Sequence, residues 1–130
     1  MQVLPALISG GVERGTIDIA TALIKNGHRA IVVSSGGGLV KQLEKIGAIH
    51  IKLSVQSKNP LIIIINSIAL TLLILFLNIS IVHARSRAPA WSCYIATKIT
   101  RRKFVTTFHG TYNFKNSIKK FYNSIMVKSD

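Results

Sequence analysis

VLPALISGGVERG, residues 3–15, joins an apolar run to a glycine pair and to the start of a helical pattern. The apolar run, residues 2–8, has the length and composition of a parallel strand that is covered on both faces. Beyond the glycines, apolar side chains recur at helical spacing up to Asn26-Gly27, a pair that favours a left-handed helix end. This stretch therefore predicts a strand, a glycine-rich turn and a helix.

The same alternation continues along the chain. Apolar segments predict further strands at residues 29–33, 49–53, 79–84 and 104–107, and helical spacing predicts helices at residues 39–46, 61–77, 89–100 and 117–127. Alternating strands and helices imply a parallel sheet with right-handed crossovers and with helices on both faces. The predicted fold class is α/β, Rossmann-like, and a length of 130 residues allows one domain only.

The segment LIIIINSIALTLLILFL, residues 61–77, holds no charged residue. Its seventeen residues reach the lower limit for a membrane span, and extension to residue 82 gives twenty-two. Asn66, Ser67 and Thr71 interrupt the apolar run, and the strands on either side of it need a connection. We interpret the segment as an apolar crossover helix. The alternative is a small, basic, non-catalytic membrane-associated protein that is anchored by residues 61–82.

The net charge of +13 calls for an anionic partner or surface. Nucleic acid is not expected, because aromatic residues make up only 7% of the chain and the basic clusters at residues 98–103 and 115–120 are short. An anionic membrane surface and a phosphorylated sugar both fit the charge. An excess of lysine on a solvated face, without any partner, is the remaining alternative.

Two features bear on the cellular compartment. Cys93 is the only cysteine and has no partner for an internal disulfide, which favours a reducing environment. The first residues lack the basic region of a secretory signal. We expect a cytoplasmic protein, with peripheral contact at the inner face of the cytoplasmic membrane left open.

The turn at residues 9–15 follows a strand and opens a helix, where free backbone N–H groups and the helix dipole favour an anion. Gly10 and Gly11 let the main chain approach a ligand closely. Glu13 suits the first helical turn, whereas Arg14 is unfavourable there, which points to a ligand. The spacing is not the dinucleotide fingerprint G-x-G-x-x-G, so a plain tight turn is the alternative.

Three further polar residues follow strands. His83 and Arg85 lie at the carboxyl end of the fourth expected strand, and His109 lies just past the fifth. Ligands of open α/β sheets bind outside the carboxyl ends of the strands, so these side chains are expected to share one edge with the glycine turn. The alternative is that each histidine is structural. No Cys/His set has metal-binding spacing, and no Ser/His/Asp arrangement stands out, so neither a metal nor a catalytic triad is expected.

Five blocks of the sequence stand out, in this order: LPALISGGVERG, VVSSGGGLVKQLEKIGAIHIKL, SKNPL, IVHARSRAPAWS and FVTTFHGTYNFKNSIKKFYNSIM. In this order and spacing they closely resemble the N-terminal domain of bacterial retaining glycosyltransferases of family 4, which have the GT-B fold. The resemblance is strongest to enzymes of lipopolysaccharide core and other cell-envelope glycan assembly, and it covers nearly the whole chain.

The resemblance implies two Rossmann-like domains that face each other, of which the N-terminal one holds the acceptor and the C-terminal one holds the nucleotide-sugar donor. It implies that His109 is the catalytic-site histidine that contacts the sugar near the reaction centre. It also implies that Gly10 and Gly11 approach the donor phosphates or sugar, where we expect Arg14 as well. We also expect Glu13, His83 and Arg85 to bind the acceptor. No cofactor is implied.

The chain departs from the family pattern in two places. Residues 61–78 are far more apolar than the Arg-rich helix usual there, and the next strand is entered through Asn78 rather than through an Asp. The sequence stops at Asp130, where the family continues into its donor-binding domain. We therefore expect residues 1–130 to be a single acceptor-side domain of a truncated or split enzyme, inactive without a C-terminal half that a separate chain would supply. Its further partners would be a nucleotide sugar and a glycan or glycolipid acceptor.

Overall fold

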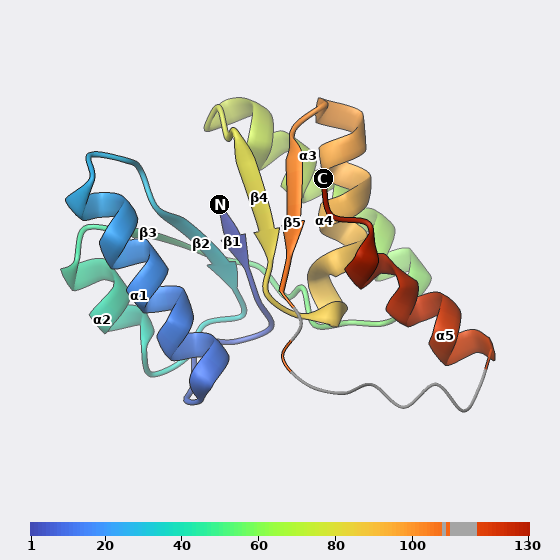
Figure 1. Ribbon diagram of the computed structural model, residues 1–130, viewed down its shortest axis with the longest axis horizontal. Coiled ribbons are helices and arrows are strands. Elements are labelled where there is room, and N and C mark those ends of the chain that lie inside the picture. The colour runs from blue at the N-terminus through green and yellow to red at the C-terminus, as the bar shows by residue number, and fades with distance from the viewer. Residues whose placement is uncertain (108, 110–116) are drawn as a thin grey trace.

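The computed structural model describes residues 1–107, 109 and 117–130. This part of the chain forms a five-stranded parallel sheet in the order β3-β2-β1-β4-β5, with helices packed around it (Figure 1). The strands are β1 (Gln2–Val3), β2 (Ile31–Ser34), β3 (Ile49–Lys52), β4 (Ile81–Ala84) and β5 (Lys103–Thr106). The helices are α1 (Gly11–Lys25), α2 (Val40–Lys45), α3 (Pro60–Phe76), α4 (Arg87–Thr100), α5 (Ser117–Ser124) and a terminal 3-10 turn, η1 (Ile125–Val127).

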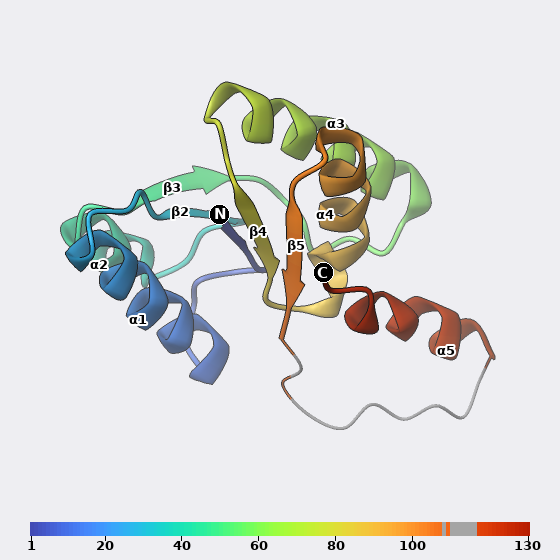
Figure 2. The same cartoon turned by 45° about the horizontal axis from the view of Figure 1, so that its top comes forward.

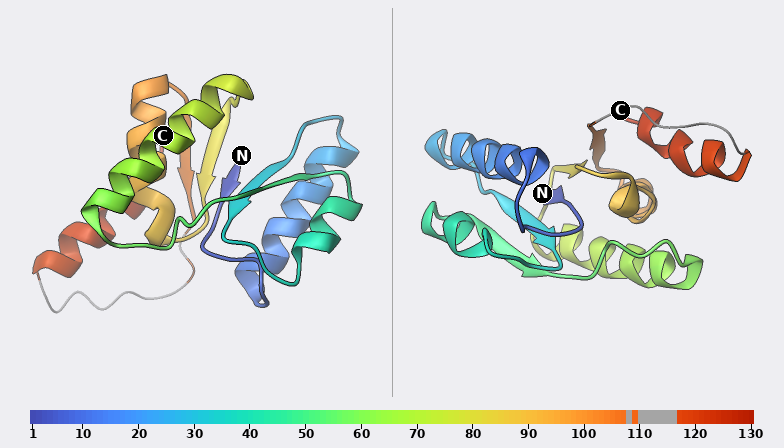
Figure 3. Two further views of the ribbon diagram at one scale, coloured as in Figure 1. Left: turned by 180° about the vertical axis from the view of Figure 1, so that it is seen from behind. Right: turned by 90° about the horizontal axis from the view of Figure 1, so that it is seen from below.

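The two faces of the sheet carry separate cores, as β2 shows. Ile31 and Val33 point into the core beneath α3 and α4, whereas Val32 points into the core beneath α1 and α2. Because consecutive strand residues point to opposite faces, this alternation means that helices cover both sides of the sheet. The predicted α/β, Rossmann-like fold is confirmed (Figure 3).

The first strand is shorter than predicted. The sequence predicts a strand over residues 2–8, but β1 ends at Val3. Pro5 has no N–H group to donate to the sheet, and the chain instead follows the loop after β2, with the Leu7 amide donating to the Gly36 carbonyl at 2.8 Å. Leu7 remains buried beneath α1 and α2, so the apolar run fills the core without extending the strand.

The predicted end of α1 is confirmed. Asn26 caps the helix, Gly27 has a φ of 75°, and the His28 amide donates to the Leu23 carbonyl at 2.9 Å. Such a closing bond uses a carbonyl that the helix leaves free, and the positive φ is the reason for glycine at this position.

The apolar segment forms the crossover helix α3, as the sequence predicts, and it packs against α4 (Figure 2). Leu70 and Ile74 are fully buried in the core of that face, and Asn66 also turns inward, donating from Nδ2 to the Ser54 carbonyl at 2.9 Å. The alternative of a membrane anchor over residues 61–82 is wrong, because β4 begins at Ile81 inside the sheet. Across the described parts of the chain, no helix has both the length and the apolar character needed to cross a bilayer.

Candidate functional site

The strand order reverses direction between β1 and β4. The chain moves outward from β1 to β3 on one side, returns through α3 to β4, and then continues to β5 on the other side. Val3 and Ala84 are register partners at the carboxyl ends of these two neighbouring strands. In open α/β sheets this switch point opens a crevice in which ligands bind. The segments that follow β1 and β4 therefore border the candidate site.

Arg85 follows β4 directly and lies beneath the first turn of α1. Its side chain is only 5% exposed, and its Nη2 donates to the Val12 carbonyl at 3.3 Å. Its Nε is buried and has no hydrogen-bond partner among the described residues. Burial lowers the pKa of the Arg85 guanidinium, because the charged form loses hydration. A buried cation at the switch point is thus incompletely satisfied by the protein.

Gly15 makes room for this guanidinium. A Cβ added at Gly15 would lie 2.8 Å from Nη2 of Arg85. Gly15 is inside α1, where glycine costs about 1 kcal/mol relative to alanine. The sequence reasoning did not single out Gly15, although a glycine within a helical pattern is a recognisable signal for a close approach of this kind.

His83 points from β4 toward the end of β5. Its Nε2 forms a hydrogen bond with Oγ1 of Thr107, a residue that sequence reasoning missed. Burial, then the charge of Arg85, and then those of the amino terminus and His109 lower the pKa of His83 to about 4. At neutral pH the ring is therefore uncharged, and it offers hydrogen bonds rather than a positive charge.

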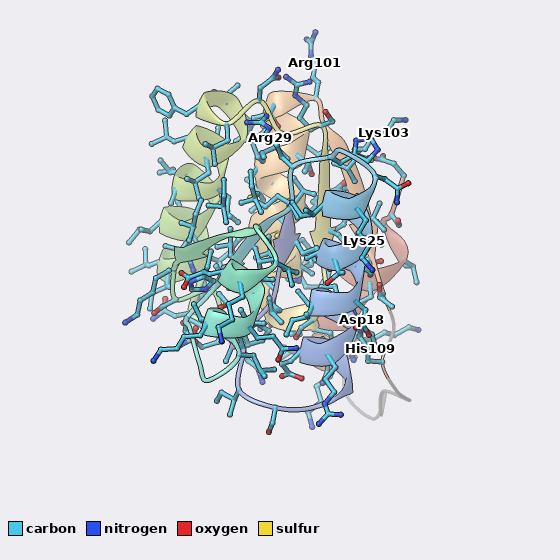
Figure 4. All side chains as sticks on the ribbon, turned by 90° about the vertical axis from the view of Figure 1, so that its left-hand side faces the viewer. Asp18, Lys25, Arg29, Arg101, Lys103 and His109 are labelled. Atoms are coloured by element: carbon cyan, nitrogen blue, oxygen red, sulfur yellow. The ribbon has the colours of Figure 1, made fainter. Side chains whose placement is uncertain are left out.

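His109 is exposed and lies near His83, since its charge contributes to the lowered pKa of His83. Figure 4 shows His109 at the end of the molecule where α1 begins, opposite the end that carries Arg29 and Arg101. It is the one residue of the FHGTY block that lies within the described residues; Phe108 and residues 110–112 lie outside them.

The glycine turn begins α1 without a side-chain cap. Gly10 is the N-cap residue with a φ of 134°, and no side-chain oxygen caps the free amides of the first turn. The Glu13 carboxylate folds back over it, with Oε2 only 2.6 Å from the position that a Cβ of Gly10 would take. Gly11 has open space around its Cα.

Arg14 takes a different direction from the other predicted site residues. Its exposed side chain lines a hollow between α1 and α2, together with Asp18, Leu39 and Gln42. The structure thus groups the glycine turn, Arg85, His83 and His109 at one edge of the sheet, and it directs Arg14 toward α2.

Within the described residues there is no group of three His, Cys, Asp or Glu side chains that could hold a metal ion. Cys93 is buried in the core beneath α3 and α4, and burial raises the pKa of its thiol well above the usual range. The groups gathered at this edge are the Arg85 guanidinium, the imidazoles of His83 and His109, the Glu13 carboxylate and the main chain of the glycine turn.

Comparison with known proteins identifies the family. The model of Glycosyltransferase Family 4 matches residues 9–129. The chain belongs to this family. A search of curated proteins gives no match.

Solved structures share the fold of this chain. A glycosyltransferase from Rickettsia africae has 57% sequence identity and a TM-score of 0.83, over 98% of this chain and 34% of that one. HepE from Anabaena, solved in complex with UDP and glucose, has 17% identity and a TM-score of 0.72, over 98% of this chain and 35% of its own. A putative UDP-N-acetylglucosamine 2-epimerase from Listeria monocytogenes has 16% identity and a TM-score of 0.57, over 96% and 37%. This family 4 chain thus spans about a third of the length of these structures.

Proposed function

We propose that this chain forms the acceptor side of a GT-B glycosyltransferase that transfers a sugar from a nucleotide sugar to a glycan or glycolipid of the cell envelope, of the lipopolysaccharide core type. The donor-binding side belongs to polypeptide outside these 130 residues, and the chain alone transfers no sugar. Family membership and the coverage of about a third of the solved relatives support this division.

One observation carries the proposal: the glycine turn, Arg85, His83 and His109 lie at the carboxyl edge of the sheet. The strand order reverses at this edge, so a ligand has access between the segments that follow β1 and β4. A purely structural role for Arg85 leaves its buried, unpartnered Nε without an explanation.

The donor end of the site lies at the first turn of α1. In the proposed reaction the bond from the anomeric carbon of the sugar to the diphosphate breaks and a bond from that carbon to an acceptor hydroxyl oxygen forms. Negative charge grows on the departing phosphate, which takes up the hydroxyl proton. The uncapped amides at Gly10 and Gly11, with the helix dipole, stabilise such charge. Arg14 lies on the same turn, but its side chain points toward α2, so it is left out of this end of the site. HepE holds UDP and glucose, which supports a nucleotide-sugar donor for this fold.

The acceptor end uses His83, Arg85 and Glu13. Because His83 is uncharged at neutral pH, it orients sugar hydroxyls by hydrogen bonding. His109 is exposed at the same edge and contacts the transferred sugar near the reaction centre.

A chimera tests the proposal. Residues 1–130 replace the matched third of the Rickettsia africae protein, a substitution that 57% identity makes practicable. The assay measures release of nucleoside diphosphate from a panel of nucleotide sugars. We expect the chimera to keep the parent's activity and His109→Ala to lower it about 100-fold. His28→Ala, at the opposite edge of the sheet, is the matched control and should leave the rate unchanged. A chimera that is inactive where the parent is active contradicts the proposal.

We further propose that the enzyme works at the inner face of the cytoplasmic membrane, touching it through α3. The outward face of this helix exposes large apolar side chains along its whole length: Leu61, Ile62, Ile64, Ile65, Ile68, Leu72, Leu75 and Phe76. Two cations lie at its C-terminal end, since Arg29 donates to the Leu77 carbonyl at 2.7 Å and Arg102 donates to Asn78 Oδ1 at 3.1 Å. An apolar strip with flanking cations fits an anionic lipid surface.

Vesicle sedimentation tests the membrane contact. We expect the chain to bind vesicles that contain anionic lipid, and we expect Ile65→Asn with Leu72→Asn to reduce binding at least fivefold. Ile19→Asn, an exposed apolar residue on α1, is the control. If the wild type, the α3 double variant and Ile19→Asn all bind equally, the attachment depends on net charge and not on the apolar face of α3.

A further inference from the structure

A hollow between α1 and α2 lies outside the groups assigned to the donor and acceptor ends. Its volume is about 450 Å³, within the range of about 300–1,000 Å³ usual for small-molecule sites, and it is lined by Arg14, Ile17, Asp18, Leu39 and Gln42. Arg14 lies in the first turn of α1 and Asp18 one turn later, so both lie on the same side of the helix. Leu39 and Gln42 come from the start of α2. The hollow thus lies where both helices begin.

The polar side chains of this hollow have no partner in the protein. Arg14, Asp18 and Gln42 are exposed, and none of them forms a hydrogen bond or an ion pair through its side chain with another described residue. An arginine and an aspartate four residues apart on a helix can pair, yet these two do not. Arg14 is also unfavourable beside the positive end of the helix dipole. The stability of α1 gives no reason for either charge.

The floor of the hollow is apolar. Ile17 is buried and Leu39 is half-buried, and both pack in the core beneath α1 and α2. The Leu39 amide donates to the Leu7 carbonyl at 2.9 Å, which ties this floor to the segment that leads from β1 to the glycine turn. The hollow therefore adjoins the carboxyl edge of the sheet, where the candidate site lies.

The charges in the hollow select the class of ligand. The chain has only four acidic residues, and it places one of them, Asp18, in the same hollow as an arginine. Asp18 would repel an anion, and Arg14 would repel a cation. A hydroxyl group both donates and accepts, so adjacent hydroxyls can donate to the carboxylate while they accept from the guanidinium and from the Gln42 amide. A sugar ring carries adjacent hydroxyls together with an apolar C–H face, which suits a floor of Ile17 and Leu39.

We infer that the hollow between α1 and α2 binds a sugar residue of the acceptor glycan, beyond the residue that receives the transferred sugar. Asp18 accepts from its hydroxyls, Arg14 and Gln42 donate to them, and the apolar floor packs against the ring. The choice of a sugar among the neutral groups that both donate and accept rests on the proposed function. Because the bound residue does not react, the hollow contributes affinity and specificity for the acceptor.

Titration of the isolated full chain with the methyl glycosides of glucose, galactose, mannose and N-acetylglucosamine, followed by ¹H–¹⁵N NMR, tests the site. We expect at least one of the four to shift the amides of Arg14, Asp18, Leu39 and Gln42 together. Asp18→Ala and Arg14→Met should each weaken this binding at least fivefold. Both side chains are exposed, so the melting temperature of each variant should equal that of the wild type.

Glu44→Gln and Lys25→Met are the matched controls. Glu44 is an exposed acid on α2, Lys25 is an exposed cation further along α1 than Asp18, and neither lines the hollow (Figure 4). Each control removes the same charge as its test variant and should leave the titration unchanged. The inference is overturned if no glycoside shifts the amides of the hollow, or if the controls weaken binding as much as the test variants. Tighter binding there of inorganic phosphate, or of N-acetylglycine methylamide as a peptide probe, would also overturn it.

The chimera separates this inference from the proposed function. With a delipidated core oligosaccharide as the acceptor probe, Asp18→Ala should raise KM for the oligosaccharide at least fivefold and leave kcat and KM for the nucleotide sugar unchanged. A higher KM for the nucleotide sugar, or a lower kcat, would overturn the acceptor assignment. An inactive chimera whose hollow still binds methyl glycosides would remove the proposed glycosyl transfer and leave the sugar site standing.

Discussion

Gly37 lies where the chain that leaves β1 crosses the loop that follows β2. It has a φ of 147°, and a Cβ at this position would lie 2.2 Å from the Leu7 carbonyl oxygen. The contact is with main chain, which cannot swing aside as a flexible side chain can. This single glycine therefore allows the segment after β1 to pass over the loop and reach the start of α1.

Gly37→Ala should lower the free energy of unfolding by at least about 2 kcal/mol, because it adds both a backbone clash and an unfavourable φ. Gly38→Ala is the matched control, since Gly38 has no positive φ and nothing lies within 4 Å of its added Cβ. Urea denaturation of both variants measures the difference. Equal stability of the two would show that the loop tolerates a different path.

His83 makes stability depend on pH in a predictable direction. Its folded pKa is about 4, below the ordinary value of 6.5, so the unfolded chain takes up a proton first as the pH falls. The free energy of unfolding that depends on a neutral His83 is fully present above pH 6.5 and is lost progressively as the pH falls toward 4. The slope stays below the value for one full proton, about 1.4 kcal/mol per pH unit, because His83 is only half-buried.

His83→Gln should remove this part of the pH dependence while keeping a hydrogen-bonding group near Thr107. Urea denaturation from pH 7 to pH 4 should show the wild type losing stability faster than the variant. The lowered pKa values of His50 and the amino terminus act in the same direction in both proteins and cancel in the comparison. Parallel curves would contradict the placement of His83 in a half-buried, cationic environment.

At the scale of elements, α3 is the part of the fold with the least usual composition. Asn59 caps it, its Oδ1 accepting from the Leu61 amide at 2.9 Å, and Pro60 occupies the first turn. Its inward side supplies Leu70 and Ile74 to the core, while the outward side is also apolar. The helix therefore packs on the core with one face only. Because both faces are apolar, the hydrophobic periodicity of the sequence does not show which face is buried.

Leu70→Ala should destabilise the protein by about 2–5 kcal/mol, because Leu70 is fully buried and its truncation leaves a cavity. Leu61→Ala, on a residue that is 70% exposed in the same helix, should change stability by less than about 0.5 kcal/mol. Chemical denaturation without lipid measures both. Similar effects of the two substitutions would contradict the packing of α3 on the sheet.

At the scale of the whole molecule, charge is strongly unbalanced. Seventeen Lys and Arg residues face four Asp and Glu residues. One acidic partner is Asp130, which lies 3.5 Å from Lys98, but exposed pairs of this kind contribute little. Repulsion among the positive side chains therefore destabilises the folded state. Added salt screens these charges and reduces the repulsion.

The melting temperature should rise by several degrees when sodium chloride is raised from about 10 mM to about 200 mM. Lys120→Glu exchanges one positive charge for a negative one and lowers the net charge from +13 to +11, so its salt response should be smaller. Differential scanning calorimetry measures both proteins. A melting temperature that is independent of salt would show that the surface charges are too widely spread to repel one another.

The sequence alone determined the order and type of the elements, because apolar periodicity and helix-end residues such as Asn26-Gly27 act locally. It also placed His83, Arg85 and the glycine turn at strand ends, which in a parallel sheet means one common edge. These inferences need no knowledge of distant contacts.

Only the tertiary structure decided which groups are buried and what they meet. Pro5 ends β1 early because its neighbours pair with the loop after β2, and α3 hides one of two apolar faces because only one of them meets the sheet. Arg85 is a surface cation by composition, yet it is buried because the first turns of α1 lie against it and Gly15 leaves space for it. Burial is set by segments far apart in the chain, so no local pattern reports it.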